Sequence, residues 1–186
     1  AFFYFLTDEL GFGPEFLGRI GVVSEISSLL GICLYQKYLR RVPIKDILFW
    51  SSILSVPLGL TTLFLITHTN RSLGIPDAAF VFGDDVILTV LGQIASLPTL
   101  VLAARLCPPG VEAVLFATLM SVNNGASAIG TELGAILTSA LGITETDNSN
   151  LGLLTVICNF TSLYPLFFIG WLDGVGDVSQ AEVEDD

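Results

Sequence analysis

Charged residues are scarce in this chain: only 13% of its 186 residues are Asp, Glu, Lys or Arg, whereas a typical soluble domain has about 25%. Histidine occurs once and cysteine three times, at Cys33, Cys107 and Cys158, so we expect neither a disulfide framework nor a zinc site. The seven Lys and Arg residues form no basic stripe of the kind that binds nucleic acid. The sequence therefore predicts no metal, no cofactor and no nucleic-acid partner.

Apolar residues are abundant instead, at 52% of the chain with a mean hydropathy of +0.76. A bilayer core about 30 Å thick is crossed by roughly 20 apolar residues in a helix. Five stretches have this length, and they are residues 20–39, 47–67, 86–104, 113–141 and 151–172. They predict an all-α, multi-pass transmembrane protein surrounded by the lipid bilayer.

The sequence predicts one helical membrane unit over residues 1–173 and an acidic, solvated tail over 174–186. The chain opens on an apolar stub at residues 1–6 that is typical of the last turns of a helix. We therefore expect the chain to be a piece of a longer protein.

Basic residues alternate between the loops. One set of loops holds Lys37, Arg40, Arg41, Lys45 and Arg105, whereas the other holds only Arg19 and Arg71. The positive-inside rule places the first set in the cytoplasm or an equivalent compartment. The loop predicted over 69–85 lies on the other side and carries a glycosylation sequon at Asn70, which matters if that side is a secretory lumen.

The stretch 113–141 is the most polar of the five. One sector of its helix contains Ser121, Asn124, Ser127, Thr131 and Thr138, with Asn123 pointing elsewhere and Glu132 flanking the sector. Polar groups at this depth either hydrogen-bond neighbouring helices or line a functional site near the midplane, and both interpretations stay open. A row of small residues through Gly130 and Gly134 predicts close packing with another helix.

Two further polar residues are candidates. Glu25, in the first stretch, is expected to pair with a base, to carry a coupling proton or to reach the interface. Gln93 gives the third stretch a polar face, and Pro57 and Pro98 predict kinks. No Ser–His–acid set, phosphate-binding loop or HExxH motif occurs, so we do not expect an enzyme.

The segment RLCPPGVEA at residues 105–113, followed by LFATLMSVNN at 115–124, resembles the folate–biopterin transporter family, a branch of the major facilitator superfamily. The stretches 1–19 and 88–95 are also similar to its plant and cyanobacterial members. The resemblance covers nearly the whole chain.

The resemblance implies a transporter of two six-helix halves, with this chain as the second half, from the end of helix seven through helix twelve, and the N-terminal half as its missing partner. It implies a folate or pterin substrate, alternating access and protons as the coupling ion. Gln93, Asn123, Asn124, Glu132 and Glu25 become candidates for substrate binding or coupling. Arg105 and Glu112 would bracket a cytoplasmic turn that couples the conformational change, or would form a local ion pair.

Two other functions stay open: a carrier of a different small solute on the same scaffold, and a truncated membrane protein that does not transport. Glu25 and the run Gly125-Ala126-Ser127-Ala128 depart from the family pattern, which leaves the substrate open. The plant-like resemblance makes a plastid envelope one expected location.

Overall fold

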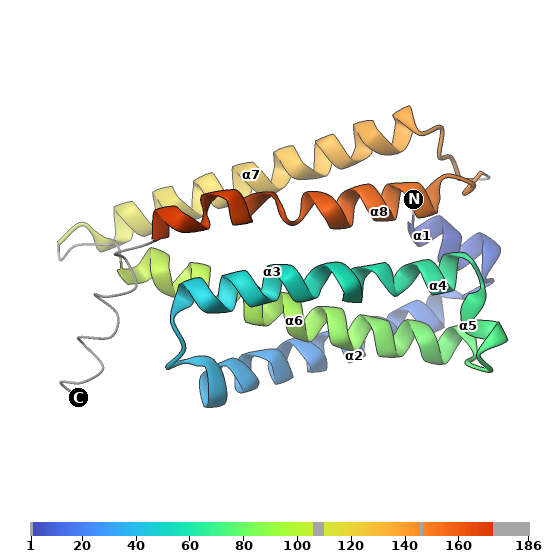
Figure 1. The fold of residues 1–186 in the computed structure, drawn as a ribbon, viewed down its shortest axis with the longest axis horizontal. Coiled ribbons are helices and arrows are strands. Elements are labelled where there is room, and N and C mark those ends of the chain that lie inside the picture. Colours follow the sequence, from blue (N-terminus) through green and yellow to red (C-terminus); the bar gives the residue numbers. More distant parts are fainter. Residues whose placement is uncertain (1, 106–109, 146, 173–186) are drawn as a thin grey trace.

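The computed structural model describes residues 2–105, 110–145 and 147–172, whose regular structure is entirely helical (Figure 1). The elements are α1 (Phe2–Tyr4), a π-helix η1 (Phe5–Glu9), α2 (Pro14–Leu34), a π-helix η2 (Tyr35–Leu39), α3 (Ile44–Leu60), α4 (Thr62–Ile66), α5 (Thr69–Ser72), α6 (Asp77–Arg105), α7 (Glu112–Ala140), α8 (Leu151–Thr161) and a 3₁₀-helix η3 (Tyr164–Leu172).

Five helical segments of the described chain have the length and apolar composition to cross a bilayer. They are Pro14–Leu39, Ile44–Ile66, Asp77–Ala104, Ala113–Ala140 and Leu151–Gly170. The prediction of an all-α transmembrane fold is therefore confirmed. The acidic tail 174–186 lies outside the described residues.

The third of these helices is longer than the sequence suggested. We predicted a loop over 69–85, but α6 already begins at Asp77, directly after Pro76. A carboxylate in the first turn is favourable because it faces the unsatisfied N–H groups at the helix N-terminus. The prediction was wrong because Asp84 and Asp85 were assigned to a solvated loop, whereas both lie within α6.

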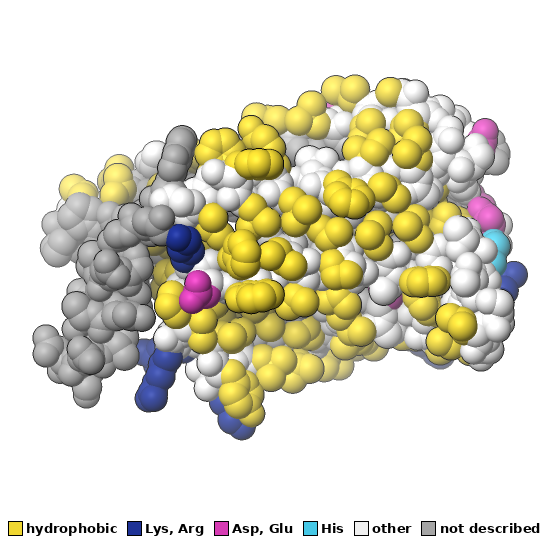
Figure 2. All heavy atoms as spheres, viewed as in Figure 1, with side chains coloured by type: hydrophobic (Ala, Val, Ile, Leu, Met, Phe, Trp, Pro, Cys, Tyr) yellow, Lys and Arg dark blue, Asp and Glu magenta, His cyan; other side chains and the backbone are white. Residues whose placement is uncertain are grey.

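The long helices run side by side (Figure 1). α6 packs along both α2 and α3, α8 packs along α3 and α4, and α7 has only sparse contacts with α6 and α8. In the view of Figure 2, hydrophobic side chains cover the middle of the bundle, and charged side chains gather at its two ends. This is the distribution expected of a protein whose middle faces lipid.

The tightest hydrophobic packing lies at one end of the bundle. Phe5, Leu65 and Leu151, which come from η1, α4 and the start of α8, are each 2% exposed or less and belong to one cluster. The opposite end contains the connection 40–43 and the end of α6, so the basic loops share one end, as predicted (Figure 1).

Two glycines permit close contacts between helices. A Cβ at Gly31 of α2 would lie 2.8 Å from Gln93 Cβ and 3.0 Å from Val90 O of α6. A Cβ at Gly59 of α3 would collide with the amide of Asn159 on α8. Gly31 therefore needs to lack a side chain, whereas a side chain at position 59 would require the Asn159 amide to move.

Pro57 lies in α3, and the helix is interrupted four residues later. Thr61 N donates to Leu58 O, three residues back, and α4 continues the same membrane-length segment from Thr62. The kink predicted at Pro57 therefore appears as a joint at Thr61. Pro98 is buried inside a continuous α6.

Candidate functional site

Gln93 is the predicted site residue that the structure places between helices. Its Nε2 donates to Ser28 Oγ of α2 at 2.5 Å, beside the Gly31 contact. Ser96 Oγ donates to Gln93 O at 3.1 Å and lies 3.3 Å from Gln93 Oε1. The amide is thus held within the α2–α6 interface by its neighbours.

Asp84 and Asp85 are half-buried polar residues that the sequence analysis missed as site candidates. Ser24 Oγ of α2 donates to Asp85 Oδ2 at 2.5 Å. Thr61 Oγ1 contacts Asp84 Oδ1, and Thr62 Oγ1 donates to Asp84 Oδ2 at 2.9 Å. Neighbouring positions on a helix point in directions about 100° apart, so one carboxylate reaches α2 and the other reaches the α3–α4 joint. The signal was Asp77 after Pro76, a helix start that would have placed both acids inside the helix.

The polar residues of α7 are arranged differently. The side chains of Asn123, Asn124 and Glu132 are exposed, and none of these three side chains forms a hydrogen bond with another described residue. The hydroxyls of Ser121, Ser127, Thr131 and Thr138 donate to carbonyl oxygens four residues back in the same helix, at 2.8–3.0 Å. These hydroxyls are therefore satisfied within α7 and do not link it to a neighbour, whereas the amides and the carboxylate remain available.

The row of small residues on α7 is also uncovered, with Gly130 exposed and Gly134 half-buried. A Cβ at Gly130 or Gly134 would meet no atom within 4 Å. The close helix contact predicted there is absent from the part of the chain that the structure describes. The polar sector and the small-residue row therefore form an uncovered face of a membrane-length helix.

Glu25 is exposed on α2 and forms neither a hydrogen bond nor an ion pair with a described residue. It does not join Gln93 or the α7 residues in one constellation. Arg105 ends α6 and Glu112 begins α7, but their side chains lie outside the described set, so the proposed turn between them stays a prediction.

Asn70, in the predicted sequon, is fully buried. Its Nδ2 donates to Asp77 Oδ1 at 2.6 Å and to Ile75 O at 3.1 Å. Arg71 binds the same carboxylate, with Nη2 2.6 Å from Asp77 Oδ2, and this bond raises the pKa of the Arg71 guanidinium. Asn70 is therefore a structural residue at the start of α6, and its side chain is inaccessible in the folded protein.

Glu9, at the end of η1, connects two other segments at this end of the bundle. His68 Nε2 lies 3.4 Å from Glu9 Oε1, and Asn148 Nδ2 donates to Glu9 Oε2 at 3.4 Å. His68 has a positive φ of 54° between α4 and α5. Its partners are protein groups, consistent with a structural role.

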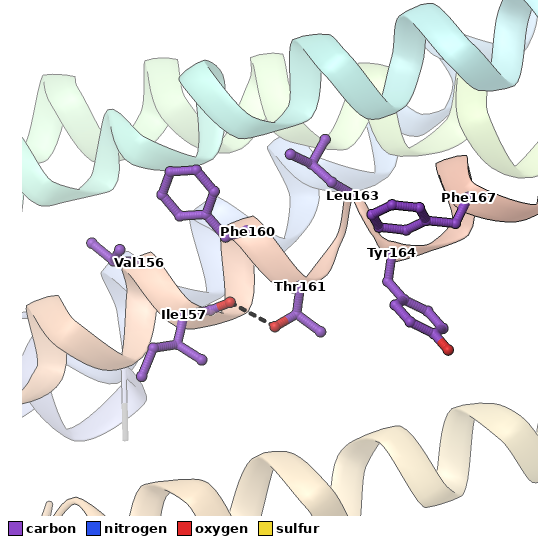
Figure 3. A pocket seen from close by; sticks show the side chains of 7 residues that line it. All are labelled: Val156, Ile157, Phe160, Thr161, Leu163, Tyr164 and Phe167. Atoms are coloured by element: carbon purple, nitrogen blue, oxygen red, sulfur yellow. Dashed lines mark hydrogen bonds between the residues drawn. The ribbon is translucent and has the colours of Figure 1, made fainter.

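An open cavity of about 460 Å³ lies along α8 and η3 (Figure 3). Its lining is apolar except for two residues, Thr161 and Tyr164. Thr161 Oγ1 donates to Ile157 O of its own helix at 2.8 Å. The cavity therefore offers few groups that could orient a polar solute. Among the described residues, no three His, Cys, Asp or Glu side chains come together to hold a metal ion.

Comparison with known proteins identifies the family. The sequence profile of the BT1 family matches residues 1–185. The chain is 56% identical over 172 residues to a Synechocystis protein named folate-biopterin transporter, covering 92% of this chain and 35% of that protein.

Two further relatives are more distant. The chain is 34% identical to folate transporter 1 of Plasmodium falciparum, covering 90% of this chain and 33% of the relative. It is 33% identical to Probable folate-biopterin transporter 2 of Arabidopsis thaliana, covering 99% and 37% respectively. The chain thus spans about a third of the length of these relatives. No solved structure matches it. With its membrane-length helices, the chain is an integral, multi-pass membrane protein, and it belongs to the BT1 family.

Proposed function

We propose that this chain is one half of a secondary transporter that carries folates or pterins across a membrane. The observation that supports this most directly is the uncovered polar face of α7. Asn123, Asn124 and Glu132 lie on a membrane-length helix without partners among the described residues. Polar groups at such depth are costly unless they face a partner or a water-filled cavity.

The chemistry of this face suits a pteridine ring. The ring presents several hydrogen-bond donors and acceptors, and a side-chain amide offers both kinds of group. Asn124 lies 12 residues after Glu112, which is roughly 18 Å along the helix and close to the middle of a bilayer. Transporters commonly bind their substrates at this depth.

The rest of the protein is proposed to complete the cavity. The relatives named above are about three times as long as this chain, which leaves room for another six-helix half of the major facilitator type. In this arrangement the α7 face would meet the substrate and the other half. Rocking of one half against the other would open the cavity alternately to each side.

Several finer assignments belong to the same proposal. Protons are the proposed coupling ion, with Glu25 and Gln93 as further candidates for substrate binding or coupling. Arg105 and Glu112 are proposed to couple movement at the cytoplasmic turn. Residues 1–173 would form the membrane unit, 174–186 a solvated tail, and the similarity to an Arabidopsis relative makes a plastid envelope the proposed location.

Within the proposed substrate class, this chain favours the uncharged pterin portion. The carboxylates of folate would require cationic partners. Between Lys45 and Arg105 the sole Lys or Arg is Arg71, which lies outside the membrane-length segments and is bound to Asp77. Cationic groups for folate would then come from the rest of the protein.

Uptake of labelled folic acid by the full-length protein in a folate-requiring host tests the proposal. We expect uptake by the wild type and a loss of at least tenfold with Asn124→Ala or Glu132→Gln. Gln36→Ala is the matched control, because Gln36 is an exposed amide at the far end of the first long helix. Uptake that survives both α7 changes, or uptake of an unrelated solute alone, would contradict the proposal.

A further inference from the structure

The two ends of the bundle hold their arginine side chains in different ways. At one end the arginines are paired with carboxylates at 2.6 Å, and the pairs are Arg19 with Glu15 and Arg71 with Asp77. At the other end Arg40 and Arg41 are exposed, and neither side chain forms an ion pair or a hydrogen bond with a described residue. The described chain thus neutralises the arginines of one end and leaves the charges of Arg40 and Arg41 open.

Arg40 and Arg41 belong to a short segment, residues 37–45, that we call the basic turn. It also contains Lys37 and Lys45, and the carboxylate closest to it in the sequence is Asp46. Like charges this close together repel one another, so the basic turn attracts an anion from outside the described chain.

The basic turn lies at the boundary between two membrane-length segments, of which the first ends at Leu39 and the second begins at Ile44. Its backbone is held from the protein side, because Tyr35 just before it and Ile47 just after it are buried. Within it, Val42 N donates to Leu39 O at 3.0 Å. In Figure 2, Lys and Arg side chains project from this end of the bundle. The positive charges therefore lie where a bilayer has its headgroups.

Exposed aromatic rings accompany these charges. Tyr38 is 63% exposed and Trp50 58% exposed. Lys37 Nζ lies 5.2 Å from the centroid of the Tyr38 ring, and Trp50 packs edge-on against Phe49 at 5.6 Å. Trp50 is six residues after Ile44, or roughly 9 Å along the helix. Rings exposed at this depth are typical of contact with lipid, which favours a lipid over a water-soluble anion as the partner of the turn.

The chemistry of the turn suits a phosphate group. A guanidinium presents its N–H groups in a planar fork that matches two phosphate oxygens. Clusters of Lys and Arg next to a membrane-spanning helix attract anionic lipids of the cytoplasmic leaflet. A zwitterionic headgroup also has a phosphate, but its own cation cancels most of the attraction, so the net charge of the lipid should decide binding.

We propose that the basic turn binds the headgroup of an anionic phospholipid. Arg40 and Arg41 bind the phosphate, Lys37 and Lys45 add positive charge around it, and the acyl chains lie against Trp50. The lipid supplies the negative charge that carboxylates supply at the opposite end of the bundle. This site is separate from the α7 face and does not depend on which solute the protein carries.

Quenching of Trp50 fluorescence in the full-length protein tests the proposal. The protein is placed in bilayers of phosphatidylcholine and phosphatidylglycerol in which one lipid or the other has brominated acyl chains, because bromine quenches a tryptophan that it contacts. Each protein is measured against its own Trp50→Phe version, which isolates the emission of Trp50. The ratio of quenching by the two brominated lipids at equal mole fraction gives the local enrichment of the anionic lipid.

We expect an enrichment of at least about threefold in the wild type and a ratio near one in the combined variant Lys37→Gln, Arg40→Gln and Arg41→Gln. Arg19→Gln is the matched control, because Arg19 is an exposed arginine that is already bound to Glu15 at the opposite end. It should keep the wild-type ratio. A ratio near one in the wild type would overturn the proposal, as would equal enrichment in the wild type and the combined variant. Trp50 emission that neither lipid quenches would overturn it too, because protein would then cover this surface.

If the combined variant does not fold, the wild type alone still decides. At about 1 M NaCl the screening length falls to about 3 Å, and the enrichment should fall to near one. Enrichment that persists in high salt would contradict binding by charge.

Two further measurements separate the lipid from other anions. Residues 174–186 are acidic, so a variant that lacks them is compared with the wild type. Enrichment that appears only in this shortened protein would mean that the acidic segment occupies the turn, and the proposal would fail for the intact protein. Inorganic phosphate at about 10 mM, compared with NaCl of the same ionic strength, should leave the enrichment unchanged. Its loss would identify a general anion site instead of a lipid site.

Discussion

Helices α6 and α7 are each 29 residues long and apolar enough to span a membrane, yet their surroundings are opposite. α6 lies between α2 and α3. Its side chains Asp85 and Gln93 form hydrogen bonds with α2, and Asp84 accepts one from Thr62 of α4. On α7, every residue from Ala113 to Leu133 except Leu119 and Met120 is exposed. The difference indicates that α6 has its packing partners within this bundle, whereas we expect those of α7 to lie outside it.

The apolar residues of α7 lead to the same conclusion. Val114 is 71% exposed, Val122 66% and Ile129 63%. Such surface is acceptable against lipid but gains nothing from packing in this bundle, and the amides on the same helix gain nothing from lipid. A helix with both features is expected to face lipid on one side and protein or a cavity on the other.

The strongest test of this comparison places a leucine at Gly31, where α2 packs closely against α6, and at Gly130, where α7 packs against nothing in the described chain. Gly31→Leu forces a side chain into Gln93 and the backbone of Val90, and overpacking of this kind costs about 1–3 kcal/mol or more. Gly130→Leu meets no described atom. In the purified full-length protein we expect Gly31→Leu to lower the thermal unfolding midpoint strongly.

The companion Gly130→Leu variant reveals what covers α7. A small effect on unfolding would mean that this face meets lipid or a cavity. A loss as large as that of Gly31→Leu would mean that another helix of the complete protein packs there, and the contrast between α6 and α7 would then hold only for this part of the chain.

The second largest effect is expected at the start of α6. Asn70→Ala removes two hydrogen bonds of a fully buried side chain, and leaving buried groups unpaired costs about 1–3 kcal/mol. We expect a clear drop in the unfolding midpoint. Expression of the wild type in a glycosylating host should give no glycosidase-sensitive shift at this position, and a shift would mean that Asn70 is accessible before or after folding.

How far these features could be predicted from the sequence differs between the two helices. Run length alone predicted five spans, because the thickness of the bilayer sets the length of a helix regardless of its neighbours. The start of α6 was misplaced, because adjacent Asp residues are typical of loops and their hydroxyl partners come from distant positions, Ser24 and Thr62. Partners of this kind follow from packing, which a single helix sequence does not encode.

For the candidate site, the sequence predicted which residues share a helix face but not which contacts they make. The polar sector of α7 was found from periodicity alone, since helical geometry places those residues on one face. Gln93 was also predicted as a candidate. Its contact with Ser28 was not predicted, because Gly31 was not recognised as a point of close approach between α2 and α6. The π-turns of η2 and the nine-residue 3₁₀-helix η3 had no signal, as neither has a distinctive sequence period.

A smaller difference in thermal stability is expected between variants of the two amide residues, Gln93 and Asn124. Gln93→Ala breaks the 2.5 Å bond to Ser28, and the loss of one such hydrogen bond costs about 1 kcal/mol. Asn124→Ala breaks no bond to a described residue and should leave the unfolding midpoint unchanged while lowering uptake. If Asn124→Ala destabilises the full-length protein more than Gln93→Ala does, its amide is a structural contact, and the proposed site on α7 is wrong.

The smallest expected effects on the unfolding midpoint come from single contacts at the start of α6 and at the end of α7. The start of α6 is held by the ion pair of Arg71 with Asp77, in which the arginine side chain is 55% exposed. The end of α7 is held by Asn150, whose Nδ2 donates to Leu141 O at 2.7 Å. We expect Arg71→Gln and Asn150→Ala each to lower the unfolding midpoint slightly. Salt distinguishes them, because it screens an exposed ion pair and leaves a neutral hydrogen bond nearly unchanged. The deficit of Arg71→Gln should therefore disappear at high salt while that of Asn150→Ala persists; a salt-independent deficit at Arg71 would mean that its contact with Asp77 acts through packing rather than charge.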